Sequence, residues 1–143
     1  MSSLVSQIPP ASPSLALTHF SNRLAFETDC SDVHASFQAG EVDFVLLDVR
    51  TPQAFAAGHV PGAVNLPYRY LTADNLAAYA SDTLFVVYCA GPHCNAVHRA
   101  AARLAAQGFA VKEMLGGMTG WVDEGFAVSR QALAPVGAGC GCE

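Results

Sequence analysis

Short apolar runs along the chain alternate with turns rich in glycine, proline and polar residues, and this pattern predicts strands and helices in alternation. The clearest strand is Leu84–Tyr88, where five apolar and mostly β-favouring residues are consecutive. Phe44–Val49 is apolar except at Asp48, as expected for a strand that is buried on both faces. Shorter strands are predicted at Ala63–Leu66 and Phe109–Leu115, with a weaker candidate at Leu24–Thr28.

Helices are predicted between these strands from capping residues, glycine and proline stops, and apolar positions at helical spacing. The longest is the alanine-rich segment from about Asn95 to Gln107, which ends at Gly108. The other expected helices are one capped by Ser14 that carries Leu15, Leu17, Phe20 and Leu24; one capped by Asp29 or Ser31 that ends at Gly40; Pro52–Ala57; one capped by Thr72 that runs through Leu76 and Tyr79; and one opened by Gly116 and Gly117 that carries Trp121.

The alternation of strands with helices indicates an α/β domain with a mostly parallel sheet and helices on both of its faces. In such folds the ligand site lies beyond the carboxyl ends of the strands. Residues 1–13 are punctuated by prolines and are expected to form a flexible lead-in to a single domain over residues 14–130. The chain becomes rich in alanine and glycine after Phe126, which buries too little to stay ordered, so residues 131–143 are expected to form a flexible Gly/Cys tail.

Length and charge narrow the range of partners. The 143 residues fit one domain, and a hydrophobic content of 52% is ample for one core. Seven basic and twelve acidic residues give a net charge of −5, which argues against nucleic acid and against anionic membrane surfaces as partners. No apolar run approaches the roughly 18 residues that span a bilayer, and no basic segment opens the chain as in an export signal. We therefore expect a cytoplasmic protein.

Cys89 is the strongest candidate for chemistry, because it follows the Leu84–Tyr88 strand and opens a short loop into the next helix. A thiol attacks as the thiolate, and a free cysteine is mostly protonated at neutral pH. The helix N-terminus carries partial positive charge, and Gly91 lets the loop curl so that backbone N–H groups point inward. Both features are expected to favour the Cys89 anion. A buried structural thiol is the plainer alternative, but it explains the following Gly-Pro and helix start less well.

Three motifs occur in order along the chain. The first is residues 48–67, DVRTPQAFAAGHVPGAVNLP; the second is Tyr88-Cys89 with its loop; the third is residues 116–121, GGMTGW. In this order, over roughly residues 24–126, they resemble the signatures of the rhodanese family and are far more specific together than singly. The resemblance implies a three-layer α/β/α fold with a central five-stranded sheet. It also implies a sulfurtransferase of the thiosulfate sulfurtransferase type, in which Cys89 accepts a sulfane sulfur as a persulfide and passes it to a thiophilic acceptor.

The loop from Cys89 to Cys94 spans six residues, and its length separates functions within that family. Six-residue loops are typical of its sulfurtransferases, whereas seven-residue loops that end in arginine belong to phosphatases and arsenate reductases. The seventh position here is Asn95, so the bidentate clamp that phosphate needs is absent. The predicted substrate-binding residues are those of the loop and the first position after it: Ala90, Gly91, Pro92, His93, Cys94 and Asn95.

The loop contains no Lys or Arg, unlike many relatives that use thiosulfate. His93 is its only titratable group besides the thiols. Arg50, and Arg99 about one helical turn beyond the loop, are candidate accessory cations. A persulfide donor on a small thiol or on a protein needs less positive charge at the site than thiosulfate does, so both classes of donor stay open.

Cys94 has three open roles: it can attack a Cys89 persulfide and convert it to a disulfide, share in anion binding, or fill the helix start. Two alternatives to a sulfurtransferase follow. One is a thiol redox protein that uses Cys89 and Cys94, and the other is a non-catalytic rhodanese-like module that binds or delivers partners. The intact thiol argues against the module. Cys140 and Cys142 can bind a soft metal, relay sulfur or do neither, and a solvated tail is favoured because two ligands do not close a zinc site.

The remaining polar and cysteine candidates are expected to be structural. Asp48 and Arg50 are expected to tie loops together, His59 to be a hydrogen-bonded turn residue, and Cys30 and Trp121 to pack. His19, His34 and His98 have no metal-ligand spacing, so we expect no metal and no cofactor. The expected partners are small sulfur donors and thiol acceptors, with a protein donor or acceptor as a further option.

Overall fold

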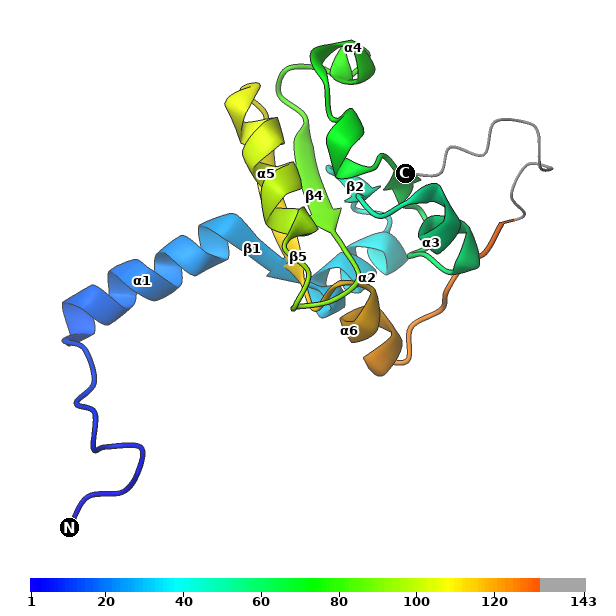
Figure 1. The fold of residues 1–143 in the computed structure, drawn as a ribbon. Helices are drawn as coiled ribbons and strands as arrows, with labels where there is room; N and C mark the ends of the chain where they lie inside the picture. The colour runs from blue at the N-terminus through cyan, green and yellow to red at the C-terminus, as the bar shows by residue number, and fades with distance from the viewer. Residues whose placement is uncertain (132–143) are drawn as a thin grey trace.

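A five-stranded parallel sheet forms the centre of the protein, and helices cover both of its faces (Figure 1). The strand order is β1-β5-β4-β2-β3, and every strand pair in the sheet is parallel, which confirms the predicted α/β/α fold. The computed structural model describes residues 1–131. Its elements are α1 (Pro13–Phe26), β1 (Glu27–Asp29), α2 (Cys30–Ala39), β2 (Val45–Asp48), α3 (Pro52–Ala57), β3 (Val64–Asn65), the 3₁₀ helix η1 (Tyr68–Tyr70), α4 (Ala73–Leu76), β4 (Leu84–Tyr88), α5 (Ala96–Ala106), β5 (Ala110–Leu115) and α6 (Gly117–Asp123).

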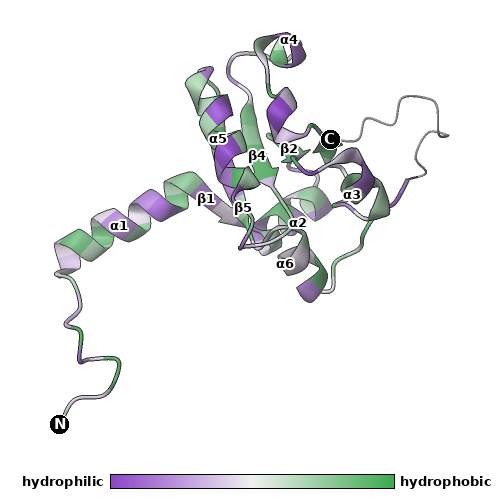
Figure 2. Cartoon of the chain, viewed as in Figure 1, coloured by the Kyte–Doolittle hydropathy of each residue, from purple (hydrophilic) through white to green (hydrophobic). Residues whose placement is uncertain are grey.

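The central strand β4 supplies side chains to both halves of the core. Phe85 and Val87 pack on the side of α5, whereas Val86 and Tyr88 pack on the side of α2 and α6, and all four are buried. Figure 2 shows most of the strand as hydrophobic. Because both faces of β4 are covered, its sequence is apolar throughout instead of alternating with polar residues.

The carboxyl ends of β2, β3 and β4 meet at one edge of the sheet. The N–H of Leu66 donates to the carbonyl of Asp48 (3.0 Å), and the N–H of Tyr68 donates to the carbonyl of Val49 (3.3 Å). These bonds fix the chain after β3 beside the end of β2. Cys89 follows β4, the neighbour of β2, so it lies at the edge where a parallel sheet is expected to bind ligands.

Most of the predicted helices and strands begin and end close to the residues that the sequence indicated. Asp29 caps α2 through its side chain, and Gly40 ends that helix with a left-handed φ of 70°. Thr72 caps α4, but the helix ends at Leu76 instead of reaching Tyr79, whose N–H closes a separate turn on the Leu76 carbonyl (3.1 Å). The strands other than β1 lie within one residue of their predicted bounds.

The prediction for the first helix and strand was wrong in its boundaries. Ser12, not Ser14, accepts the capping hydrogen bond, because Pro13 suits the first helical position and has no N–H to satisfy. The helix continues through Leu24–Phe26, which were predicted as part of a strand. β1 is therefore confined to Glu27–Asp29, the residues that pair with the end of β5.

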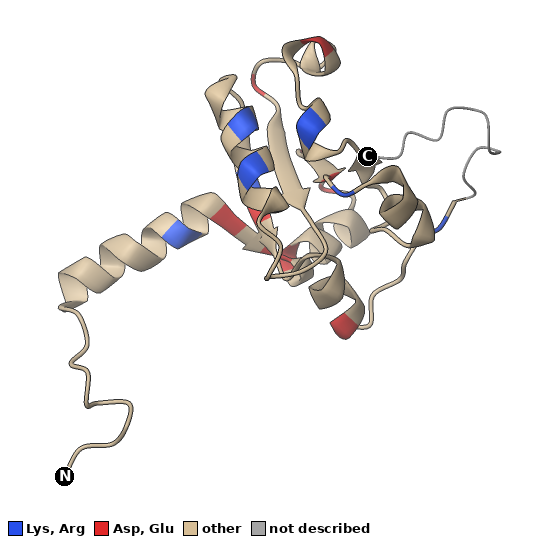
Figure 3. Cartoon of the chain, viewed as in Figure 1, with Lys and Arg blue, Asp and Glu red and all other residues tan. Residues whose placement is uncertain are grey.

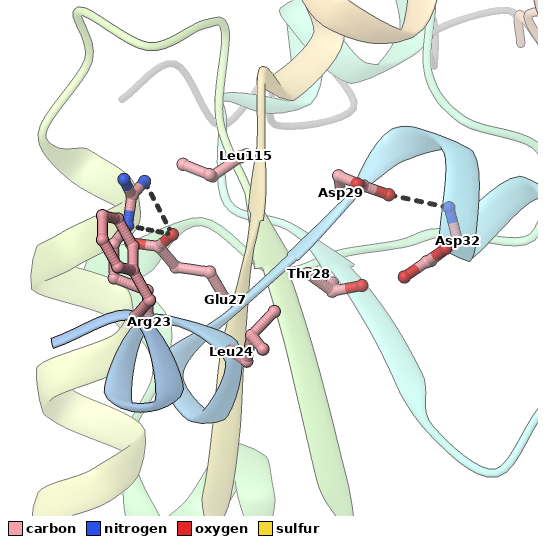
Figure 4. A pocket seen from close by; sticks show the side chains of 8 residues that line it. Arg23, Leu24, Glu27, Thr28, Asp29, Asp32 and Leu115 are labelled. Atoms are coloured by element: carbon pink, nitrogen blue, oxygen red, sulfur yellow. Dashed lines mark hydrogen bonds and ion pairs between the residues drawn. The ribbon is translucent and has the colours of Figure 1, made fainter. Parts of the chain in front are cut away.

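Helix α1 projects from the domain, and none of its residues is buried (Figure 1). Its predicted apolar positions are present but unpacked among the described residues, and Figure 2 shows hydrophobic and polar bands along it. Within residues 1–131 no helix is both long and apolar enough to cross a bilayer. A hollow at the base of α1 is lined by Phe20, Arg23, Leu24, Glu27, Thr28, Asp29, Asp32 and Leu115, with an Arg23–Glu27 ion pair of 2.9 Å beside it (Figure 4).

The segment from Ala127 to Gln131 is held against the domain by backbone hydrogen bonds, although the composition after Phe126 predicts little burial. His59 and Ser129 exchange two backbone hydrogen bonds of 2.9 Å, and the N–H of Gln131 donates to the Ala56 carbonyl (3.1 Å). Backbone bonds of this kind need no apolar side chains, so composition gives no sign of them. The rest of the predicted tail, with Cys140 and Cys142, lies outside the described residues.

Candidate active site

Cys89 lies on a cavity of about 300 Å³ at the carboxyl edge of the sheet. Three segments enclose it: the turn from β2 into α3, the chain after β3 as far as η1, and the loop from Cys89 to the start of α5. Cys89 is only 5% exposed and packs with core residues under α5. The thiol therefore faces a small, largely apolar space beside the core.

The first turn of α6 holds the beginning of the Cys89 loop. The N–H of Met118 donates to the carbonyl of Cys89 (3.0 Å), and the N–H of Thr119 donates to the carbonyl of Ala90 (2.9 Å). The hydroxyl of Thr119 donates to the same Ala90 carbonyl (2.9 Å). The sequence analysis did not place α6 in the site. The Gly-Gly pair after β5 could have indicated its position, because it lets this helix start close to the end of the neighbouring strand β4.

The Gly91 position depends on close packing and not on a left-handed turn. Its φ is outside the left-handed region, so the loop turns here without the backbone conformation that only glycine adopts easily. A side chain here would bring a Cβ within 3.0 Å of the Thr119 hydroxyl. The loop closes instead through a turn in which the N–H of Cys94 donates to the Gly91 carbonyl (3.1 Å).

Thr119→Val is expected to loosen the loop, since valine keeps the shape of threonine but removes the hydroxyl donor to Ala90. The expected loss is about 1 kcal/mol in the free energy of unfolding, the usual net value of one hydrogen bond. Urea denaturation measures it. A variant as stable as the parent would mean that the backbone N–H of Thr119 alone is enough to hold the loop.

Asp48 and Arg50 tie the end of β2 to the following turn, as predicted. The carboxylate of Asp48 is fully buried and accepts from Nε and Nη2 of Arg50, at 3.0 and 2.6 Å. Arg50 Nη2 also donates to the carbonyl of Gly58 (2.6 Å). Burial alone would lower the pKa of Arg50, but the hydrogen bonds and charge of Asp48 outweigh it and raise the pKa. The Arg50 guanidinium also lines the cavity, with its charge already paired.

Cys89 and Cys94 interact, and Cys94 is the more acidic of the two. Burial, followed by the hydrogen bond that its thiol donates to Cys94, raises the pKa of Cys89 to about 12. Burial would also raise the pKa of Cys94, but hydrogen bonds from the Cys89 thiol and from the backbone N–H groups of Ala96 and Ala90 outweigh it and lower the pKa. The start of α5 thus favours an anion, but on Cys94 and not on Cys89 as the sequence predicted.

The other predicted site residues are divided between the cavity and the surface. Ala90 and Cys94 line the cavity together with Cys89. The exposed residues that do not line it are Pro92, His93, Asn95 and Arg99. Arg69, which no sequence pattern singled out, does line the cavity; the signal was its position just after β3, at the same sheet edge as Cys89. Among residues 1–131, no three His, Cys, Asp or Glu side chains are grouped to hold a metal ion.

The structure resembles solved structures of known proteins. The BH2092 protein of Bacillus halodurans matches with a TM-score of 0.80 and 32% sequence identity, over 83% of this chain and 87% of that one. The rhodanese-like domain of the Alr3790 protein from Anabaena matches with a TM-score of 0.66 and 27% identity, over 78% of this chain and 86% of that one.

Sequence comparison finds relatives of several kinds. Thiosulfate sulfurtransferase GlpE of Pseudomonas entomophila is 40% identical over 78 residues, which are 54% of this chain and 69% of the relative. An HTH-type transcriptional regulator of Mycobacterium tuberculosis is 40% identical over 102 residues, 71% of this chain. The match spans only 43% of that regulator. The sequence model of the rhodanese-like domain family matches residues 29–124, which are more than half of the sequence. The chain therefore belongs to the rhodanese-like domain family.

Proposed function

We propose that this protein is a sulfurtransferase that carries sulfane sulfur as a persulfide on Cys89. The observation that carries the proposal is the place of Cys89, directly after the central strand and on a cavity that is also lined by a second cysteine and two arginines. Thiosulfate sulfurtransferases among the relatives support the same reaction class. A cytoplasmic location and a protein donor or acceptor remain predictions that go with this function.

The proposed reaction consists of two displacements. The Cys89 thiolate attacks the outer sulfur of the donor, a new S–S bond forms, and the S–S bond of the donor breaks; with thiosulfate the leaving group is sulfite. An acceptor thiolate or another thiophile then attacks the outer sulfur of the persulfide and leaves Cys89 as the thiolate. The burial of Cys89 favours a persulfide that is shielded from water and oxidants.

The proton of Cys89 needs an acceptor before attack, because burial opposes its ionisation. Cys94 lines the same cavity, and its lowered pKa makes it the thiol of the pair that ionises first, so its thiolate is proposed to take that proton as Cys89 attacks. A role as general base is thus added to the three roles that the sequence left open for Cys94.

Cys94→Ser is expected to move the pH dependence of persulfide formation to higher pH. In the parent, the pair loses its first proton at Cys94, whose pKa is lowered, so reactivity rises as pH increases through that value. Serine does not ionise in this range. The remaining Cys89 thiol keeps a pKa raised by burial, so its reactivity rises only at higher pH. Single-turnover rates with thiosulfate across pH measure the shift, and an unchanged or acid-shifted profile would contradict it.

A thiol redox protein is the second candidate, and the contact between Cys89 and Cys94 favours it. Diamide would then oxidise the two thiols to a disulfide with the loss of two hydrogens. Alternatively, a Cys94 thiolate attacks the Cys89 sulfur of a persulfide, and hydrosulfide leaves. Intact-mass spectrometry separates the candidates: a sulfurtransferase retains the added sulfur until an acceptor arrives, whereas a redox protein converts it to a disulfide without one.

A further inference from the structure

Two arginines, Arg50 and Arg69, are among the residues that line the Cys89 cavity, and their charges are used differently. The charge of Arg50 is paired with the buried Asp48 carboxylate. Arg69 is exposed, and within residues 1–131 its side chain forms no ion pair and no hydrogen bond. No Asp or Glu among these residues lines the cavity. Among the described residues, Arg69 is therefore the arginine of the cavity lining whose charge is unpaired, although the Cys89 loop has no basic residue and the chain is acidic overall.

The backbone of Arg69 is fixed on both sides. Arg103 of α5 donates to the carbonyl of Tyr68 (3.1 Å), and its guanidinium lies 5.5 Å from the centre of the Tyr68 ring. Asn75 of α4 donates to the carbonyl of Tyr70 (2.7 Å). The η1 turn is thus held by two helices, so the guanidinium is presented from a rigid support. Figure 3 shows basic positions on α5 and on this turn between β3 and α4.

The size and lining of the cavity limit the ligand. A volume of about 300 Å³ lies at the lower end of the range for small-molecule sites, so the ligand is small. The lining besides the thiols and guanidinium groups is largely apolar, including Val49, Pro67 and Ala96. In such surroundings an unpaired guanidinium favours an oxyanion that it can bind with two parallel N–H donors.

We propose that Arg69 binds the oxyanion end of the sulfur donor, so that this site takes small donors in which a sulfane sulfur is bonded to an oxidised, anionic sulfur group, namely thiosulfate or an organic thiosulfonate. This inference rests on the proposed sulfur transfer. The Cys89 thiolate attacks the sulfane sulfur, the donor S–S bond breaks, and sulfite or a sulfinate leaves with the bonding electron pair beside Arg69. A cation from η1 then takes the place of the missing loop cation.

Arg69→Gln is expected to raise the KM for thiosulfate about tenfold or more and to leave kcat within about twofold, because a charge-assisted hydrogen bond to the donor is lost. Arg69→Lys restores part of the affinity. Arg99→Gln is the matched control, since Arg99 is an exposed arginine that does not line the cavity. The inference is overturned if Arg69→Gln leaves KM unchanged, or if Arg99→Gln raises it equally.

A second measurement needs no sulfur transfer. Iodoacetate and iodoacetamide alkylate thiols by the same displacement but differ in charge, and peptide mapping reports the rate at Cys89 for each. Arg69→Gln is expected to lower the iodoacetate rate several-fold and to leave the iodoacetamide rate unchanged. If thiosulfate is not turned over but Arg69→Gln lowers the ratio of the iodoacetate rate to the iodoacetamide rate, the anion site stands and the proposed function fails. If the ratio of the two rates is equal in parent and variant, the anion site itself is overturned.

Discussion

Cys89→Ser is expected to abolish sulfur transfer from thiosulfate to cyanide, with a loss of at least about a thousandfold in kcat/KM. Serine has neither an ionisable thiol nor a sulfur that can form a persulfide. Because the two side chains are close in size, the variant is expected to unfold at a similar urea concentration to the parent. Thiocyanate production measures the activity, and urea denaturation measures the fold.

Cys30→Ser provides the matched control for this result. Cys30 is as buried as Cys89, at 4% against 5% exposure, but it packs at the start of α2 and does not line the cavity. Its thiol donates to the carbonyl of Leu115 (3.4 Å), a bond that a hydroxyl can replace. Equal activity loss in the two variants would show that a general disturbance of the core, and not the chemistry of Cys89, explains the effect.

Gly117→Ala is expected to destabilise the protein by about 3 kcal/mol or more, through overpacking against backbone and through an unfavourable φ. Gly117 has a φ of 58°, and a Cβ there would lie 2.5 Å from the carbonyl oxygen of Cys89 and 3.0 Å from the nitrogen of Gly91. Neither atom belongs to a flexible side chain, so the loop or α6 must move. Urea denaturation measures the loss.

Gly108→Ala separates the two causes. Gly108 has a φ of 88°, and a Cβ at this position would have no atom within 4 Å. Its substitution is therefore expected to lower the free energy of unfolding only through the unfavourable φ, by about 1 kcal/mol. Equal destabilisation at both glycines would contradict the close approach of α6 to the Cys89 loop. Gly117→Ala is also expected to lower kcat at temperatures where the protein remains folded, because the displaced atoms belong to the loop, whereas Gly108→Ala is not.

The features predicted well from the sequence are those that depend on neighbouring residues. β4 is found at its predicted bounds, because two-sided burial makes five consecutive residues apolar. The caps at Asp29 and Thr72 are found because each needs only a side-chain oxygen and an N–H three residues on. The position of Cys89 at the carboxyl edge follows from the strand that precedes it.

The features that were missed depend on contacts between distant segments. The relative acidity of Cys89 and Cys94 is set by burial and by their contact across the loop, neither of which spacing reveals. Arg69 reaches the cavity only because β3 lies beside β2, whose other neighbour is β4. The hydrogen bonds of Ser129 to His59 join segments 70 positions apart in the chain. Each requires the strand order or the folded packing to be known.

Mass spectrometry after incubation with thiosulfate shows whether Cys89 itself carries the sulfur. The parent is expected to gain the mass of one sulfur atom, peptide mapping is expected to place it on Cys89, and an acceptor thiol is expected to remove it. Cys89→Ser is expected to gain none, and Cys30→Ser to gain one. Cys89 is not the sulfur carrier if the sulfur maps to another cysteine, if the protein instead loses two hydrogens in a bond between Cys89 and Cys94, or if neither thiosulfate nor glutathione persulfide adds any mass.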